Sequence, residues 1–214
     1  MPDLAAERVD YLGDHLLESG VPNEPYALFR RWLDEAFAAR DRGELAEPTA
    51  MGVATCAGGR PRVRTVLLKD LTADGFTFFT NYDSAKGAEI AADAQVALHF
   101  GWHAIHRQVR VEGVAEKVSR SESEAYFATR PRGSQLGAWA SSQSSVVGSL
   151  AELQESYAAA ETRFSDVVPC PPHWGGYLVR PTEVEFWQGQ PSRMHDRLVY
   201  RLSEGSWTIT RLAP

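Results

Sequence analysis

Residues 51–80, MGVATCAGGRPRVRTVLLKDLTADGFTFFT, decide the fold class of this chain. Runs at 51–56, 62–69 and 76–80 are short, rich in β-branched and aromatic residues, and alternate with a period of two, which is typical of β-strands. The connecting segments, AGGRP and LTADG, supply the Gly, Pro and Asp residues that tight turns need. Strands joined by such short turns favour an antiparallel sheet or closed barrel over a parallel sheet with crossover helices.

Further strands and helices are predicted on both sides of residues 51–80. Further strands are predicted at 95–100, 108–118, 176–186, 198–202 and 206–211. Helices are predicted at 25–37, 84–92, 121–130 and 149–164. The first follows Asn23 as a cap with Pro25 in its first turn, and the last begins with Ser149 and Glu152, which fit a capping box. The predicted fold class is mainly β with peripheral helices, an α+β domain with a β-barrel core.

The amino-terminal segment differs from the remainder of the chain. Residues 1–22 are polar and weakly patterned, so we expect an arm that orders only against another surface. Residues 23–214 are predicted to form a single domain.

Composition excludes several classes of function. A net charge of −6 argues against nucleic acid as a partner, because phosphate-backbone binding needs clustered positive charge over a wide surface. The sequence contains no apolar run near the roughly 20 residues that span a bilayer, and its amino terminus does not have the pattern of a signal peptide. Cys56 and Cys170 match no metal or redox spacing, so we expect them unpaired. These features predict a cytoplasmic protein with no membrane association.

Basic residues gather in or beside the predicted strands instead of on exposed helix faces. The clusters are Arg60, Arg62, Arg64 and Lys69; Arg107 and Arg110; Arg130 and Arg132; and Arg193, Arg197 and Arg201. Guanidinium groups suit phosphate geometry, so together the clusters suggest a phosphorylated ligand. Neither a P-loop nor a dinucleotide-binding glycine motif is present in the sequence, so side chains would have to hold the phosphate.

Two segments raise specific geometric questions. Tyr126 and Arg130 are four residues apart on one predicted helix face, before Pro131; either they converge on an anion, or Tyr126 packs and Arg130 caps the helix. Arg64 and Lys69 fall on opposite faces of a regular strand. Either they serve opposite sides of a ligand, or a bulge re-aims one of them.

Other candidate sites are weaker. His103 and His106 have an H-x-x-H spacing, but no third ligand is evident, so no metal is predicted. Ser144 lacks the surroundings of a nucleophile elbow, which disfavours a hydrolase. Trp174 and Trp187 either belong to the core or form a flat wall for an aromatic ligand.

An ordered set of stretches runs through the sequence: EPTAM, RTVLLK, FFTNYDSAKG, WHAIHRQVRVEG, YFATRPRGSQLGAWASSQSS, WGGY, VEFWQGQPSRMHDR and the terminal RLAP. In these stretches, and so along nearly its whole length, the chain resembles the pyridoxine (pyridoxamine) 5′-phosphate oxidases. The resemblance implies an FMN-binding split β-barrel that works as a homodimer, with two flavin sites at the subunit interface. Its implied reaction is oxidation of pyridoxine or pyridoxamine 5′-phosphate to pyridoxal 5′-phosphate by O2, releasing H2O2, and ammonia from the amine.

The resemblance also implies roles for individual residues. FMN would be held by Arg64, Thr65, Val66, Leu67, Leu68, Lys69, Phe79, Thr80, Lys86, Gln108, Gln143, Ser144, Trp187 and Arg197. The substrate would be bound by Arg8, Tyr11, Lys69, Tyr126, Arg130, Ser134, Arg193 and His195, with Arg193 and His195 as the catalytic pair. Arg8 and Tyr11 would belong to an arm that folds over the substrate as a lid. On the predicted strand Arg193, His195 and Arg197 share one face, whereas Met194 and Asp196 face the other way to pack or to orient neighbours.

This sequence departs from the family pattern at two places. Ala85 stands where an arginine is common, so one guanidinium for the FMN phosphate is missing. Glu47 stands where an aspartate is common, and we assign it no catalytic role. Two alternatives stay open: a flavin oxidase of a secondary metabolite on the same fold, and a protein that binds FMN or pyridoxal phosphate without turnover. A third and simpler alternative is a split-barrel interaction domain without a cofactor.

Overall fold

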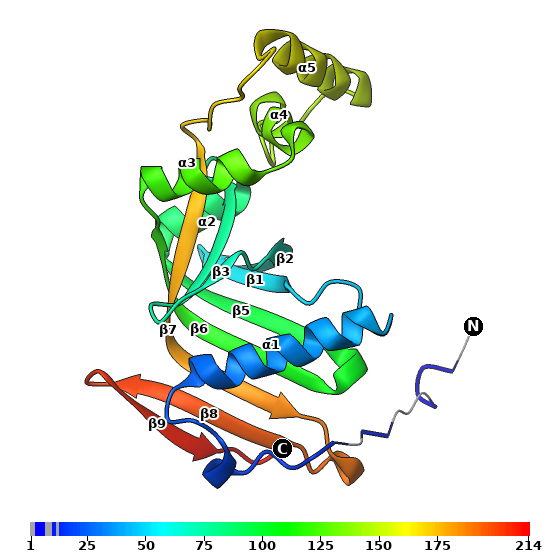
Figure 1. Ribbon diagram of the computed structural model, residues 1–214, viewed down its shortest axis with the longest axis vertical. Helices are drawn as coiled ribbons and strands as arrows, with labels where there is room; N and C mark the ends of the chain where they lie inside the picture. The colour runs from blue at the N-terminus through cyan, green and yellow to red at the C-terminus, as the bar shows by residue number, and fades with distance from the viewer. Residues whose placement is uncertain (1–2, 7–9, 12) are drawn as a thin grey trace. The chain divides into compact units, whose positions relative to one another are not determined.

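The structure is a computed structural model, and it describes residues 3–6, 10–11 and 13–214. Arg8, one of the predicted substrate residues, lies outside the described residues. The helices are α1 Pro25–Asp41, α2 Ala85–Ala92, α3 Arg120–Thr129, α4 Arg132–Ala140 and α5 Leu150–Arg163. The strands are β1 Ala50–Ala57, β2 Arg60–Leu67, β3 Asp70–Leu71, β4 Phe76–Asn81, β5 Gln95–Trp102, β6 Arg107–Lys117, β7 Trp174–Gln188, β8 Asp196–Ser203 and β9 Ser206–Arg211. Figure 1 shows these elements.

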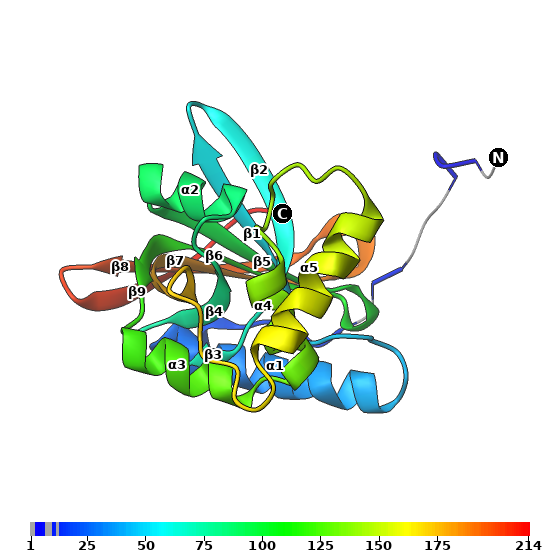
Figure 2. The same cartoon turned by 90° about the horizontal axis from the view of Figure 1, so that it is seen from above.

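The strands are hydrogen-bonded in the order β2-β1-β5-β6-β7-β4-β3, and β8 pairs with both β7 and β9. A tight turn joins β1 to β2, as predicted, and another joins β8 to β9. The hairpin predicted at LTADG is wrong in its partner: β4 pairs with the short β3 and with β7, and β2 lies at the other end of the strand order. Gly58 and Gly59, between β1 and β2, both have positive φ, at 57° and 72°. A two-residue hairpin turn that matches the twist of its strands requires positive φ at both positions, which glycine adopts without strain. Figure 2 shows this hairpin projecting from the strands beside it.

The chain divides into two compact units. Unit 1 comprises Met1–Val53, Ala97–Gly113 and Pro181–Pro214, and unit 2 comprises Ala54–Val96 and Val114–Arg180. Strands β1, β5, β6 and β7 each contain a boundary between the two units, so each unit takes part of these strands. That residues 23–214 fold as one domain stays a prediction.

Unit 1 is built around α1. The residues of α1 that recur at helical spacing, Leu28, Phe29, Trp32, Ala36 and Ala39, are all buried. Phe29 meets Phe100 edge to face at 4.8 Å between ring centroids, and Trp32 meets Phe186 at 5.2 Å. The predicted cap is wrong by one residue: Glu24 is the N-cap, and its side chain makes no capping bond. Pro25 alone sets the first turn, because its fixed φ suits that position.

Unit 2 carries the other helices. Trp174 and Phe127 lie in its apolar core with Leu136 and Val168, and α4 and α5 run side by side (Figures 1 and 2). The reciprocal capping box lies at α3, where Ser119 and Glu122 bond each other's backbone N–H. At α5 the box predicted for Ser149 is only half formed, because the Glu152 carboxylate accepts from Gly148 instead.

The predicted elements are confirmed with shifts of a few residues. The elements that were missed are β3, α4 and the 3₁₀ turns Glu18–Gly20, His103–Ile105 and Pro191–Arg193. Leu150, the first residue of α5, is 70% exposed, and the buried residue of that helix is Ala160. Cys56 and Cys170 are both free, as predicted. Over the part of the chain that the structure describes, none of the helices is both long enough and apolar enough to span a bilayer.

Candidate functional site

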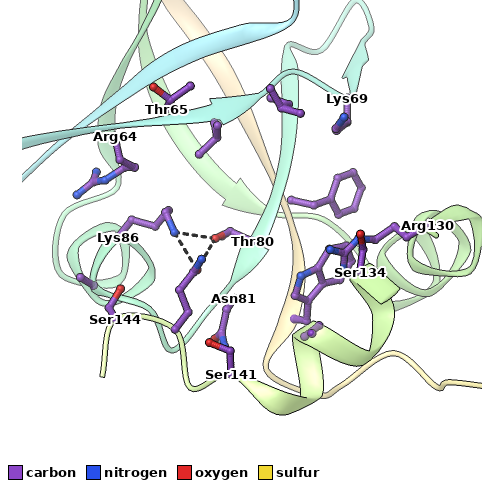
Figure 3. Close-up of a pocket in the computed structure, with 18 of the residues that line it drawn as sticks. Arg64, Thr65, Lys69, Thr80, Asn81, Lys86, Arg130, Ser134, Ser141 and Ser144 are labelled. Atoms are coloured by element: carbon purple, nitrogen blue, oxygen red, sulfur yellow. Dashed lines mark hydrogen bonds between the residues drawn. The ribbon is translucent and has the colours of Figure 1, made fainter. Parts of the chain in front are cut away.

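A cavity of about 710 Å³ lies in unit 2. It is lined by the end of β2, by β4, by the first turn of α2, by α3 and α4, and by the segment 141–144. Figure 3 shows Arg64, Lys86 and Ser144 on one side of it and Lys69, Arg130 and Ser134 on the other. Thirteen of the predicted site residues line this cavity: Arg64, Thr65, Val66, Leu67, Lys69, Phe79, Thr80, Lys86, Tyr126, Arg130, Ser134, Gln143 and Ser144. Their gathering in one place is the main finding about the site.

Lys86 forms the first polar centre of the cavity. Its ammonium group is buried and donates to Gln143 Oε1 at 2.9 Å, Thr80 Oγ1 at 3.0 Å and Ser84 Oγ at 3.3 Å, and two of these bonds are drawn in Figure 3. Burial and the nearby Arg64 guanidinium lower the pKa of Lys86. All three partners are neutral, so the positive charge of Lys86 is left for an anion.

Arg64 stands beside Lys86 and is held by a buried carboxylate. Its guanidinium donates to Thr55 Oγ1 and to Glu89 Oε2, each at 2.6 Å. Glu89 also accepts from Thr55 and from Arg62. The hydrogen bonds from Thr55, Arg62 and Arg64 lower the pKa of Glu89 to about 2 against the opposing effect of burial. Glu89 is thus ionised at neutral pH and fixes where Arg64 points.

The end of β2 explains where the Arg64 and Lys69 side chains point. The strand ends at Leu67, and Lys69 N–H donates to Thr77 at 2.8 Å, outside the regular ladder of β2. Both side chains therefore reach the same cavity, although they are an odd number of residues apart. The two alternatives are therefore not exclusive: the chain is irregular after β2, and Figure 3 shows the two side chains on opposite sides of the cavity. Leu68, predicted to contact FMN, is buried and does not line the cavity.

Arg130 forms the second polar centre. It is the C-cap of α3, with ψ of 147°, the extended geometry that Pro131 imposes on the residue before it. Its guanidinium lies over the Trp174 ring at 4.6 Å, and Nη1 is buried without a hydrogen-bond partner among the described residues. Burial lowers the pKa of Arg130, and the side chain stays charged because its ordinary pKa is far above neutrality. A buried guanidinium nitrogen with no protein partner is a position for an anionic oxygen.

Three aromatic rings support this second centre. Phe79 stacks on Tyr126 at 4.0 Å and on Trp174 at 5.5 Å, and the three rings are nearly parallel. Tyr126 therefore packs and faces the cavity at once, so the two predicted alternatives for it are not exclusive. Arg130 does not cap α3 through its side chain. We call Phe79, Tyr126 and Trp174 the aromatic stack.

The remaining predicted flavin residues lie in unit 1. Gln108, Trp187 and Arg197 line a second cavity, of about 300 Å³. Arg197 donates to Glu185 at 2.6 Å and to the backbone oxygen of Ala213 at 3.0 Å, which ties the chain end to β8. The terminal Pro214 also lines this cavity.

The prediction for the segment 192–197 is wrong in its geometry. Pro191–Arg193 is a single 3₁₀ turn, with positive φ at Ser192 and Arg193, and β8 begins only at Asp196. Arg193, His195 and Arg197 therefore do not share a strand face. Met194, predicted to pack or to orient neighbours, is 66% exposed. Asp196 is buried, as expected for a residue that orients its neighbours.

His195 and Tyr11 meet in unit 1. Their rings lie edge to face at 5.4 Å, and Tyr11 also meets Trp187 at 5.7 Å. His195 Nδ1 is 3.1 Å from the backbone N–H of Gln190, so Nδ1 accepts and the ring is neutral in this geometry. Burial, followed by the Arg193 charge, lowers the pKa of His195, which agrees with a neutral ring.

Two polar residues that contact Arg64 and His195 were not predicted. Glu89 and Gln190 hold Arg64 and His195 in place, and both are buried. For Glu89 a signal exists in the sequence: it follows Lys86 by three residues on a helix whose other face is apolar. For Gln190 no local pattern distinguishes it from a loop residue.

Comparisons with known proteins identify the family of this chain. Residues 37–163 match the family described as pyridoxamine 5′-phosphate oxidase, and residues 174–214 match the pyridoxine 5′-phosphate oxidase C-terminal dimerisation region. A pyridoxine/pyridoxamine 5′-phosphate oxidase of Pseudomonas paraeruginosa is 52% identical over 99% of this chain and 98% of its own length. The protein of the same name from Ralstonia pickettii is 53% identical over the full length of both chains.

Solved structures give the same result for the fold. PhzG from Burkholderia lata, in complex with tetrahydrophenazine-1-carboxylic acid, superposes with a TM-score of 0.87 at 29% identity, over 94% of this chain and 98% of that chain. A pyridoxamine 5′-phosphate oxidase-related, FMN binding protein from Nostoc punctiforme superposes with a TM-score of 0.69 at 19% identity, over 87% and 97% of the two chains. The predicted fold class, mainly antiparallel β with peripheral helices arranged as a split barrel, is confirmed. On the strength of the family match and the full-length relatives, this chain belongs to the pyridoxamine 5′-phosphate oxidase family.

Proposed function

We propose that this protein is an FMN-dependent oxidase, a pyridoxal 5′-phosphate synthase, that converts pyridoxine or pyridoxamine 5′-phosphate to pyridoxal 5′-phosphate. One observation carries the proposal: a single cavity holds two separate anion positions, one at Lys86 and one at Arg130. A phosphorylated cofactor and a phosphorylated substrate that react together require two such positions. The names of the full-length relatives support the same reading.

The residues of the cavity fit FMN. Its volume of about 710 Å³ lies in the range of cofactor and ligand sites. Lys86 and Arg64 supply positive charge for the FMN phosphate, and Thr80, Gln143 and Ser144 supply neutral polar groups around it. The backbone and side chains of 65–67 would border the ring system, as the family resemblance implies. When bound, FMN would accept two electrons from the substrate and pass them to O2, which leaves as H2O2.

The substrate phosphate belongs at the other side of the cavity. Lys69, Tyr126, Arg130 and Ser134 line that side, with the unpartnered Nη1 of Arg130 as the strongest donor. Phe79 stacks on Tyr126 and the Arg130 guanidinium lies over Trp174, and these contacts would keep Tyr126 and Arg130 in place. Binding the phosphate there would orient the substrate so that its reacting carbon is presented in one way.

The catalytic pair acts on the pyridine side. His195 is neutral, its Nδ1 accepts from Gln190, and its Nε2 is left for the substrate. We assign to His195 assistance in removing a proton from the C4′ substituent, and to Arg193 stabilisation of charge around the ring. Arg8 and Tyr11 would cover the substrate from the arm, and Tyr11 already lies against His195.

We further propose that the protein works as a homodimer in which Gln108, Trp187 and Arg197 of one subunit complete the flavin site of its partner. The match of residues 174–214 to a dimerisation region supports this assembly, because Trp187 and Arg197 lie inside that match. Sedimentation equilibrium of the flavin-loaded protein tests it, and a monomer at micromolar concentration contradicts it.

One rival is an oxidase of a non-phosphorylated metabolite, because the PhzG structure holds tetrahydrophenazine-1-carboxylic acid. The second anion position at Arg130 favours the phosphorylated substrate. The other rival is a carrier of FMN or pyridoxal phosphate without turnover. Anaerobic mixing of the flavin-loaded protein with pyridoxine or pyridoxamine 5′-phosphate should bleach the flavin absorbance, and air should restore it with release of H2O2. A yellow protein that neither substrate bleaches contradicts the proposal.

A further inference from the structure

Asp196 is a buried carboxylate with four polar partners in unit 1. Oδ2 accepts from the Leu16 backbone N–H at 3.1 Å and from Gln190 Nε2 at 2.9 Å, and it lies 3.0 Å from His15 Nδ1. Oδ1 accepts from Arg211 at 2.6 Å. Although burial by itself raises the pKa of Asp196, the bonds from Leu16, His15, Arg211 and Gln190 hold it below its usual value. The carboxylate is therefore charged and fully engaged, with only 6% of the residue exposed.

Its partners hold the amino-terminal arm at residues 14–18. Gln190 Nε2 donates to the Asp14 backbone oxygen at 3.1 Å, and Arg211 donates to the Leu16 backbone oxygen at 2.5 Å. Arg211 also makes two bonds to the Glu18 carboxylate, at 2.8 and 2.9 Å. Leu16 is buried among these contacts. Backbone and side-chain groups of the arm thus converge on Asp196 and Arg211.

The arm carries Tyr11 to His195. Only three residues separate Tyr11 from His15, so fixing the chain at 14–18 limits where the Tyr11 ring can lie. Gly189 makes room for that ring, because a Cβ at this position would lie 2.9 Å from two of its carbons. Tyr11 then meets His106, His195 and Trp187 edge to face.

Asp196 reaches His195 by a second path. The Gln190 side chain is held by Asp196, and the Gln190 backbone N–H holds His195 Nδ1. A carboxylate adjacent to His195 in sequence thereby fixes both the imidazole and the tyrosine that faces it, without lining either cavity.

We propose that Asp196 is a positioning residue that fixes His195 and Tyr11 for the substrate by binding the arm at His15 and Leu16 and the loop at Gln190. The proposal rests on the proposed function for its kinetic part, and its structural part stands independently of it. It predicts that residues 14–18 are docked on β8 and β9 before substrate arrives.

Hydrogen exchange tests the structural part on the flavin-loaded full chain. In Asp196→Asn the amides of residues 13–18 should exchange at least tenfold faster than in the wild type, because the Leu16 N–H loses its ionised acceptor. Asp74→Asn is the matched control, since Asp74 is an exposed carboxylate paired with Arg180, and its exchange at 13–18 should equal that of the wild type. Wild-type exchange in Asp196→Asn overturns the proposal.

Steady-state kinetics with pyridoxine 5′-phosphate test the positioning part. Asp196→Asn should raise KM about tenfold with FMN still bound. In a protein that already carries Tyr11→Ala, the rise in KM caused by Asp196→Asn should be at least threefold smaller, because the two residues act through one contact. Additive effects of Asp196→Asn and Tyr11→Ala overturn the positioning role.

A safer variant covers the case in which Asp196→Asn does not fold. His15→Ala changes a side chain that is 69% exposed and should raise exchange at 13–18 at least threefold; unchanged exchange there counts against the docked arm. A failure of the proposed function itself appears differently, as a wild-type protein that releases no peroxide while its arm exchange still depends on Asp196.

Discussion

Arg64 and Glu89 form an ion pair, with 2.6 Å between Nη2 and Oε2, at the border of the cavity in unit 2. The carboxylate is buried, and the guanidinium faces the anion position that it shares with Lys86. The orientation of Arg64 is therefore set by a residue that does not line the cavity. This arrangement and the two anion positions lead to four predictions.

Replacing Glu89 by Gln should lower stability at neutral pH by roughly 1.5–3 kcal/mol, the worth of hydrogen bonds to a charged group. Because the pKa of Glu89 falls from 4.5 to about 2 on folding, its contribution is complete above pH 4.5 and is lost as the pH falls toward 2. Urea unfolding of both proteins between pH 3 and 7 should thus show a difference that shrinks in acid. Glu44→Gln, on an exposed ion pair, is the control. A difference independent of pH contradicts the assignment.

Replacing Arg130 by Met should raise KM for pyridoxine 5′-phosphate about 10- to 150-fold and leave FMN bound, since a charge-assisted bond is worth roughly 1.5–3 kcal/mol. The control is Arg132→Met, because Arg132 donates to the backbone oxygens of Phe164 and Asp166 and does not line the cavity. Initial rates of peroxide release measure the effect. An unchanged KM would remove Arg130 from the substrate phosphate.

Replacing Lys86 by Met should weaken FMN about 10- to 150-fold, because the buried ammonium is the charged group surrounded by Thr80, Ser84 and Gln143. Lys117→Met serves as the comparison, since Lys117 is exposed and lies over the Tyr82 ring. Flavin fluorescence on titration of the apoprotein gives both dissociation constants. Equal constants for the wild type and Lys86→Met would show that the FMN phosphate lies elsewhere.

Ala85→Arg should tighten FMN about tenfold or more by supplying a guanidinium that the family commonly has at this position. Ala85 is exposed and lines the cavity, so an arginine there has room to reach the phosphate. Ala88→Arg adds the same charge to the same helix away from the cavity and should leave the affinity nearly unchanged. The flavin titration described for Lys86 measures both, and equal tightening by the two variants would indicate a long-range charge effect only.

The sequence predicts the strands well because their signal is local. The strands predicted at 51–56, 62–69 and 76–80 are each indicated by alternation and by neighbouring turn residues, whereas the two-residue β3 is too short to give such a pattern. Helix α4 was missed because Gly133 and Gly137 are poor helix formers, and the helix depends on the packing of Leu136 in the core of unit 2. The prediction that Arg193, His195 and Arg197 share a strand face is wrong because the chain turns, with positive φ at Ser192 and Arg193, before β8 begins.

The candidate site was predicted as a set of residues but not as a set of contacts. The resemblance to a family gave Arg64, Lys86 and Arg130, and the structure brings all three to one cavity. What holds them depends on pairs far apart in the chain, such as Arg64 with Glu89 and His15 with Asp196, which are separated by 25 and 181 residues. No periodicity in a single sequence encodes such pairs, because each partner looks like an ordinary surface charge.

The aromatic stack has a thermodynamic consequence. Phe79 stacks on both Tyr126 and Trp174, and the Arg130 guanidinium lies over the Trp174 ring, so these groups are ordered before any ligand arrives. Immobilising a flexible side chain on binding costs about 0.5–1.5 kcal/mol in conformational entropy, and here folding has already met most of that cost. Phosphate capture at this end of the cavity should therefore carry little entropic penalty from the protein, and its selectivity should derive from a rigid template instead of from closure around the ligand.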